Sequence, residues 1–165
     1  FLPLTKNNKL VLMGRAELGF LGYYNINKRS PFEIFWVGGD GMTGYSSTYA
    51  TETVALRGYT NGSLTPYYNG YQAGNIYARF SIELRYPIVL KESTMVWALV
   101  FAEAGNCWRD YNNFNPFDLK RSAGVGLRVY MPMIGLLGVD WAYGFDKVNG
   151  TVSGSQFHFV IGQEF

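Results

Sequence analysis

The sequence predicts an all-β fold, a transmembrane antiparallel β-barrel fragment of about seven strands. Three observations lead to this prediction: the composition, a period-2 alternation over unusually long stretches, and connections that alternate between short and long. Of the 165 residues, 48% are hydrophobic, 18% are aromatic and only 16% are charged. Soluble domains carry about 25% charged residues. The chain therefore either buries an unusual share of its surface or contacts something other than water.

The composition also excludes several classes of protein. Intrinsic disorder is excluded because aromatic residues are abundant and the formal net charge is only +2. The same small charge gives no electrostatic basis for binding nucleic acid. The single cysteine, Cys107, excludes an internal disulfide framework and a zinc site built from several thiolates. No apolar run approaches the roughly 18 residues that a membrane-spanning helix needs.

The clearest alternation lies between residues 76 and 86. One face of this predicted strand carries Ile76, Ala78, Phe80, Ile82, Leu84 and Tyr86, and the other carries Tyr77, Arg79, Ser81, Glu83 and Arg85. Similar patterns predict strands at 10–22, 95–107, 121–131, 136–146 and 155–165, and the apolar run 32–37 predicts another. Most of these strands match the roughly 9 to 11 residues of a tilted membrane strand better than the usual 5 or 6.

The predicted connections differ in length in a regular way. They are short at 23–31, 87–94 and 132–135, and long at 38–75, 106–120 and 146–154. A transmembrane β-barrel shows this asymmetry, with short periplasmic turns and long external loops. A soluble sandwich is the alternative, but the polar faces mix Gly with Arg and Glu, whereas a watery surface would carry mainly Lys, Thr and Ser.

An odd number of strands does not fit a complete bacterial single-chain barrel, because those barrels have even strand numbers. Seven strands therefore lead us to expect further strands upstream of Phe1. No internal repeat and no linker is visible, so residues 1–165 are treated as one structural unit.

A succession of short motifs carries a resemblance to a known family. In chain order these are Phe35-Trp36-Val37-Gly38-Gly39, Ala55-Leu56-Arg57-Gly58-Tyr59, Ser81 to Pro87, Phe101 to Gly105, Arg121 to Arg128, Trp141 to Phe145, and Phe157 to Phe165. Together they resemble the C-terminal barrel half of the BamA superfamily, the outer-membrane protein assembly factors also called bacterial surface antigen domains. The resemblance spans nearly the whole chain in the family's order.

The resemblance implies a place in a larger protein and a function. The chain would supply the last seven strands of a barrel of about 16 strands. Residues 1–165 would be the C-terminal part of an outer-membrane barrel domain, without its N-terminal strands and its periplasmic repeats. The implied function is assembly and insertion of client β-barrel proteins in the outer membrane of a Gram-negative bacterium, without enzymatic activity or a cofactor. The implied partners are the lipid bilayer, client proteins and accessory assembly proteins.

The resemblance also places a loop motif, Leu56, Arg57, Gly58 and Tyr59, inside the barrel lumen. Its arginine would meet acidic side chains of the inner wall, here Glu83 and Glu103. Glu83 lies on the polar face of its strand, so it points into the lumen if Phe80 points to lipid. The strand around Glu103 is apolar on both faces, but a carboxylate facing hydrocarbon would cost far more than an inward Phe101.

The last strand resembles the outer-membrane signal by which assembly factors recognise a barrel. Its residues are Phe157, Phe159, Ile161, Gly162 and Phe165. Gln163 departs from the aromatic or apolar residue common near the end of such signals. Recognition would occur by strand addition at a sheet edge.

No residue pattern indicates catalysis or metal binding. His158 is the only histidine and has no ligand-spaced partner, and Cys107 is expected to be a free thiol. Three other functions stay open: a two-partner secretion pore, the barrel anchor of a surface enzyme, and a passive small outer-membrane barrel.

Overall fold

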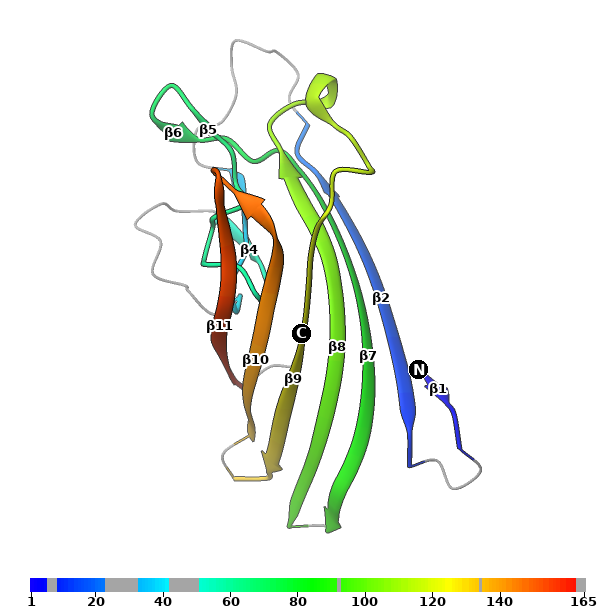
Figure 1. Ribbon diagram of the computed structural model, residues 1–165. Coiled ribbons are helices and arrows are strands. Elements are labelled where there is room, and N and C mark those ends of the chain that lie inside the picture. The colour runs from blue at the N-terminus through cyan, green and yellow to red at the C-terminus, as the bar shows by residue number, and fades with distance from the viewer. Residues whose placement is uncertain (6–8, 23–32, 42–50, 92, 134, 163–165) are drawn as a thin grey trace.

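The computed structural model describes residues 1–5, 9–22, 33–41, 51–91, 93–133 and 135–162. Its main feature is a seven-stranded sheet in the order β1-β2-β7-β8-β9-β10-β11, in which every neighbouring pair is antiparallel (Figure 1). The strands are β1 (Leu2–Pro3), β2 (Val11–Phe20), β7 (Ile76–Lys91), β8 (Thr94–Trp108), β9 (Lys120–Met131), β10 (Gly135–Val148) and β11 (Thr151–Ile161). The predicted all-β class is confirmed, and six of the seven predicted strands form the long strands of the sheet. No helix among the described residues is long and apolar enough to cross a membrane.

The sheet is open, because β1 and β11 form its two edges. Figure 1 shows the long strands side by side and bowed, with short connections at one end and the large loop segments at the other. The loop between β2 and β7 includes β3 (Ile34–Val37), β4 (Thr51–Val54) and the small pair β5 (Tyr67–Tyr68) and β6 (Tyr71–Gln72). The loop after β8 holds one 3₁₀ turn, η2 (Tyr111–Asn113).

The prediction that residues 32–37 form a strand of the wall is wrong. Within this range β3 pairs in parallel with β4, outside the main sheet, and the two-residue β1 supplies the seventh wall strand. The physical reason is that Ile34, Phe35 and Val37 are all buried. A strand with apolar side chains on both faces suits the interior of a loop body better than a wall with one polar face.

Two other expected boundaries are also wrong. Residues 146–154 are not a long loop, because β10 and β11 continue to Val148 and Thr151 and are joined by Asn149 and Gly150 at positive φ. Asn-Gly is the preferred pair for such a tight hairpin turn. Pro87 does not end its strand, since β7 continues to Lys91 past a register shift between Pro87 and Val89, where a missing N–H is tolerated. The predicted short turn at 23–31 lies outside the described residues.

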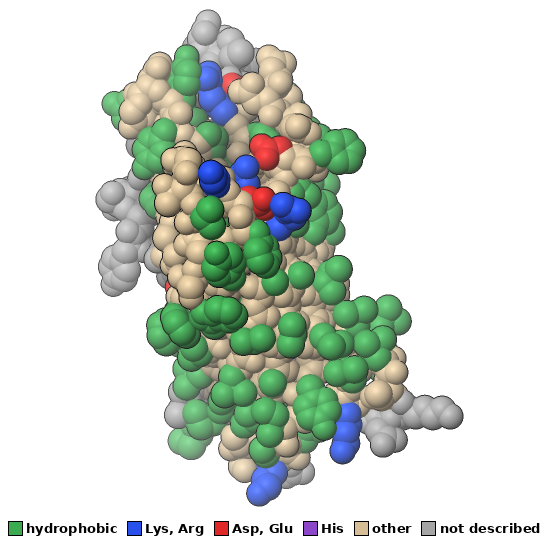
Figure 2. Space-filling view, viewed as in Figure 1, with side chains coloured by type: hydrophobic (Ala, Val, Ile, Leu, Met, Phe, Trp, Pro, Cys, Tyr) green, Lys and Arg blue, Asp and Glu red, His purple; other side chains and the backbone are tan. Residues whose placement is uncertain are grey.

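The two faces of the sheet differ as the alternation predicted. On β7, Arg79, Ser81 and Glu83 are buried and point inward, whereas Phe80 and Ile82 are exposed on the outer face. The outer face continues across the sheet with Val125, Leu127, Val139, Trp141, Tyr143 and Phe145. Figure 2 shows hydrophobic side chains over the middle and lower parts of the molecule, with acidic and basic side chains gathered above them and further basic side chains at the lower end.

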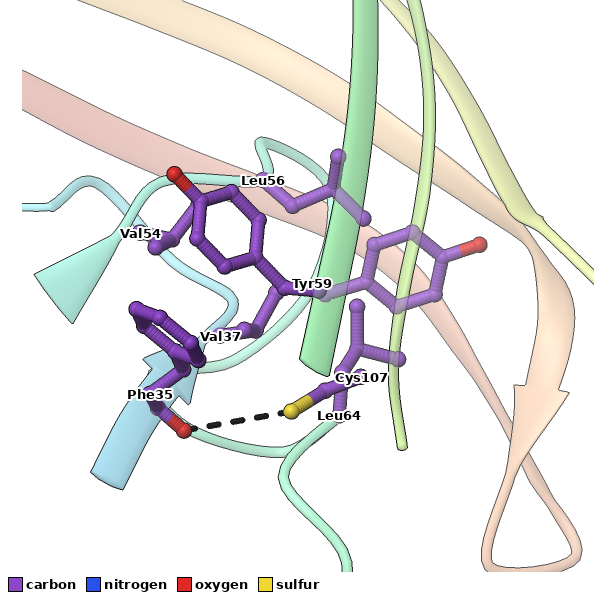
Figure 3. Packing of buried hydrophobic residues seen from close by; sticks show 8 residues of the cluster. Phe35, Val37, Val54, Leu56, Tyr59, Leu64 and Cys107 are labelled. Atoms are coloured by element: carbon purple, nitrogen blue, oxygen red, sulfur yellow. Dashed lines mark hydrogen bonds between the residues drawn. The ribbon is translucent and has the colours of Figure 1, made fainter. Parts of the chain in front are cut away.

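A hydrophobic cluster joins the loop to the inner wall. Its members are Phe35, Val37, Val54, Leu56, Tyr59, Leu64, Tyr77 and Cys107 (Figure 3). The Cys107 thiol is free, buried and donates a weak hydrogen bond to the Phe35 carbonyl at 3.9 Å. Backbone hydrogen bonds from Leu21 to Asn75 and from Phe35 to Gly74, both 2.8 Å, hold the loop against the start of β7. The loop is thus a packed body inside the curve of the sheet.

Candidate functional site

The loop motif Leu56 to Tyr59 begins two residues after the end of β4. Leu56 is held by a two-way backbone bridge with Gly39, in which both N···O distances are 3.1 Å. Leu56 and Tyr59 are both fully buried in the hydrophobic cluster. With its neighbours fixed in that cluster, Arg57 is directed at the inner wall of the sheet.

Arg57 is 0% exposed and is surrounded by carboxylates of the wall. Its Nη2 donates to Glu83 Oε1 at 2.5 Å and to Glu103 Oε1 at 2.7 Å. Its backbone N–H also donates to Glu103 Oε2, at 2.8 Å. The structure therefore brings together Arg57, Glu83 and Glu103, the three residues that the sequence analysis grouped.

Asp140 on β10 is a third acidic partner, which the sequence analysis did not assign. Arg57 Nη1 donates to Asp140 Oδ2 at 3.1 Å. Asp140 alternates along its strand with the exposed Val139 and Trp141, so parity alone indicates that it points inward, but its distance to Arg57 depends on pairing between strands. The guanidinium also lies over the Phe101 ring, 3.5 Å from the ring centroid, which explains why an aromatic side chain faces inward.

Each of these carboxylates has a second arginine from the wall itself. Arg79 Nη2 donates to Glu103 at 2.8 Å, and Arg85 Nη2 donates to Glu83 at 2.7 Å. Arg128 donates to both carboxylate oxygens of Asp140, from Nη1 at 2.5 Å and from Nη2 at 2.7 Å. Such two-nitrogen contacts to a carboxylate are among the strongest and most directional hydrogen bonds in proteins. These wall arginines were also missed, although all three lie on the polar faces of their strands.

The charged surroundings determine the protonation of Arg57. Burial alone would lower the pKa of its guanidinium, but attraction to Glu103, Glu83 and Asp140 outweighs burial and raises the pKa above its ordinary value. Arg57 is therefore permanently cationic in this position. A buried guanidinium of this kind is tolerated only while its carboxylate partners remain in place.

Gly58 is required by geometry. Its φ is +89°, and a Cβ at this position would lie 2.8 Å from Ser122 Cβ and 3.1 Å from the Gly144 backbone nitrogen. Its N–H donates to His158 Nε2 at 2.9 Å. The only histidine, for which no ligand partner was expected, thus accepts a hydrogen bond from the loop, with its own ring proton on Nδ1.

Tyr59 completes the attachment of the motif. Its hydroxyl donates to the Arg121 carbonyl of β9 at 2.6 Å. Burial raises the pKa of Tyr59 to about 12, so the phenol remains a neutral donor at ordinary pH. The motif consequently contacts β7, β8, β9, β10 and β11 at once.

The predicted C-terminal signal residues lie on β11 and just after it. Phe157, Phe159 and Ile161 are exposed on the outer face, while His158 and Val160 point inward and are buried. Gly162 has a φ of +83° and donates its N–H to the Leu136 carbonyl at 2.8 Å. Phe165 lies outside the described residues. In the described part of the chain, β11 pairs with β10 on one side and forms the last strand of the sheet.

The arrangement is suited to holding the loop against the wall, because the arginines and carboxylates of the site contact one another in ion pairs. No group of three or more His, Cys, Asp or Glu side chains in the described ranges could hold a metal ion. What the geometry can do chemically is fix a long loop to five strands, through charge-assisted hydrogen bonds to β7, β8 and β10 and neutral ones to β9 and β11.

The chain matches the Omp85 superfamily domain over residues 1–165. It belongs to the Omp85 superfamily. Among solved structures, BamA from Haemophilus ducreyi lacking POTRA domains 1-3 is similar, with a TM-score of 0.66 and 25% identity. That match covers 96% of this chain and 32% of the BamA chain, so this Omp85 sheet spans about a third of its neighbour's length. The family resemblance read from the motifs is confirmed, and the open sheet resembles a fragment of the BamA barrel.

Proposed function

We propose that this chain is the C-terminal part of the barrel domain of an outer-membrane protein assembly factor, which templates the folding and insertion of client β-barrel proteins. The observation that carries the proposal is the Arg57 motif bound to the inner wall of an Omp85 sheet by three carboxylates of that wall. The Omp85 family match and the similarity to BamA support an outer-membrane insertion or secretion protein.

The proposed mechanism needs no bond chemistry and no cofactor. A client strand cannot enter hydrocarbon with unpaired N–H and C=O groups, each of which would cost several kcal/mol. If the whole barrel opens beside β11, the backbone of this strand would offer hydrogen-bond partners, and its alternating side chains Phe157, Phe159 and Ile161 would offer contacts that can select a client strand. The Arg57 motif contributes by keeping the wall strands in register while the edge of β11 is in use.

The proposal includes a location and partners. The strands would span the outer membrane of a Gram-negative bacterium, with the outer face against lipid and the long loops outside the cell. Client barrel proteins and accessory assembly proteins would be its protein partners. The upstream strands and periplasmic repeats of the whole protein would lie before Phe1.

The proposal is tested with the full-length protein reconstituted in liposomes. We expect it to accelerate insertion of an unfolded client barrel, measured as the heat-modifiable band on a gel. A cysteine at Phe157 should cross-link to a cysteine in the client's terminal strand during insertion. Arg57→Ala should slow insertion markedly, whereas Lys91→Ala, at an exposed lysine at the other end of β7, should not.

Each alternative predicts a different result in the same system. A two-partner secretion pore would transport a partner polypeptide without inserting barrels. A barrel anchor would carry a catalytic domain upstream in the full-length sequence, and a passive barrel would leave client insertion at the rate of empty liposomes. Any of these results, without acceleration of insertion, contradicts the proposed function.

A further inference from the structure

A trough of about 610 Å³ lies on the outer face of the sheet, on the opposite side from the Arg57 site. Its apolar lining comes from Phe80 and Ile82 on β7, Ala102 on β8, Ala123 on β9 and Phe145 on β10. Arg121 on β9 lines it as well. The volume falls within the roughly 300–1,000 Å³ of small-molecule sites.

The trough exists because of small outward side chains on the two middle strands. Ala102 and Ala123 are direct partners across β8 and β9, and Ala104 lies at the next outward position of β8. Larger outward side chains flank them, so Phe80 and Ile82 form one wall and Phe145 forms the other. With this face against lipid, as proposed above, such a hollow would be filled by the acyl chains of the membrane.

Arg121 brings a positive charge to this hollow. Its side chain is 68% exposed, and it points outward at the end of β9 that lies nearest the large loops. Asp146 accepts from Arg121 Nε at 3.1 Å and from Nη2 at 2.9 Å. No acceptor for Arg121 Nη1 is found among the described residues, so this nitrogen can donate to an additional oxygen.

We propose that this trough binds a phosphorylated membrane lipid, with an acyl chain along the alanine floor and the phosphate at Arg121. This inference rests on the proposed placement of the strands in an outer membrane. The apolar trough matches an acyl chain, and the guanidinium matches a phosphate, for which arginine is the preferred side chain. Both features meet near the end of β9 that lies nearest the large loops, which is where we expect the hydrocarbon to give way to lipid phosphates.

A simpler role for Arg121 makes an opposite prediction. If Arg121 only neutralised Asp146, removing either residue would have the same consequence. In a lipid site, the Asp146 carboxylate competes with the phosphate for the same guanidinium. Removing the carboxylate charge should then strengthen lipid binding, whereas removing the guanidinium should weaken it.

The test uses native mass spectrometry of the full-length protein with dioleoylphosphatidylglycerol and with dioleoylglycerol, which has the same acyl chains and no phosphate. We expect the phosphorylated lipid to bind preferentially. Arg121→Gln should weaken its binding about tenfold, the loss of one charge-assisted contact, and Asp146→Asn should strengthen it. Lys91→Gln, a charge change at the opposite end of the sheet, should have no effect.

A second pair of variants tests the trough itself. Ala123→Phe should fill it and reduce binding of both lipids, whereas Val125→Phe, at the next outward position of β9 and outside the trough, should not. Equal binding of the two lipids, or weaker binding in Asp146→Asn, would overturn the inference. Inorganic phosphate alone, added in excess, should not displace the lipid. Co-flotation with liposomes distinguishes a failure of the lipid site from a failure of the proposed function. A protein that inserts into liposomes but binds the two lipids equally refutes only the lipid site.

Discussion

Arg57 and Arg121 present the same side chain in two opposite environments. Arg57 is fully buried inside the curve of the sheet and contacts Glu83, Glu103 and Asp140. Arg121 lies on the outer face, where its side chain is largely exposed and has one carboxylate partner, Asp146. The comparison shows that a guanidinium has more protein hydrogen-bond partners where water cannot reach it. A hydrated guanidinium needs no fixed acceptor, whereas a buried one must find protein oxygens for its donors.

The largest expected effect is the removal of the buried arginine. Arg57→Ala should destabilise the folded protein by about 3–5 kcal/mol, because it leaves three carboxylates without a shared cation. Arg57→Glu should be worse, since it adds like charge to that group. Urea unfolding of the full-length protein in liposomes measures the loss, and limited proteolysis reports release of the loop. An unchanged midpoint would contradict the role assigned to the buried network.

A second test of this comparison introduces an arginine on the outer face of the sheet. Leu127 is exposed at an outward position in the middle of β9, where we expect lipid. Leu127→Arg should cost about 2–4 kcal/mol in a bilayer, measured by unfolding in liposomes. Leu127→Met should be nearly neutral, since it keeps an apolar side chain of similar volume. If the arginine variant were as stable as the methionine variant, the outer face would be in water.

The backbone at the buried site is the next most sensitive feature. Gly58→Ala should cost about 1–3 kcal/mol, because its φ of +89° is unfavourable for alanine and the new Cβ meets Ser122. The protein should remain folded, with a looser loop that is cleaved faster by proteases. Gly70→Ala is a matched control for the φ contribution, because Gly70 has a φ of +82° with open space around it. Equal losses in both variants would show that contact with Ser122 is unimportant.

The smallest expected effect on folding is at the pair of Arg121, which is exposed, and Asp146, which is partly buried. Arg121→Gln and Asp146→Asn should each leave the unfolding midpoint close to that of the wild type, because exposed ion pairs contribute little. The same two variants are expected to move lipid binding in opposite directions. A large drop in stability for either variant would contradict the distinction drawn between the buried Arg57 and the exposed Arg121.

Much of this arrangement could be predicted from alternation along single strands. Parity alone assigns Glu83 inward and Phe80 outward, and the cost of a carboxylate in hydrocarbon assigns Glu103 inward despite apolar neighbours on both faces. These inferences need only the period-2 geometry of a strand. The Arg57 motif itself came from family resemblance, since no physical pattern distinguishes it from any other loop arginine.

What the sequence did not predict depends on relations between distant segments. Asp140 contacts Arg57 only because β10 lies beside β9, and register across strands is not visible in one strand's pattern. Residues 32–37 were assigned to the wall because a short apolar run fits either a wall strand or a buried loop strand. Their pairing with β4 is decided by the packing of Phe35 and Val37 in the hydrophobic cluster.

The parallel pairing of β3 with β4 affects how quickly Arg57 can rebind its carboxylates on the wall after a contact opens. An unstructured loop of this length would place Arg57 at a low effective concentration near the wall, and closing it would cost considerable chain entropy. The pairing of the two strands, the bridge between Gly39 and Leu56 and the hydrogen bond from Phe35 to Gly74 order the chain on both sides of the motif. Arg57 therefore stays close to its carboxylates when single contacts open, and recapture becomes a local rearrangement that needs no search by a long flexible chain.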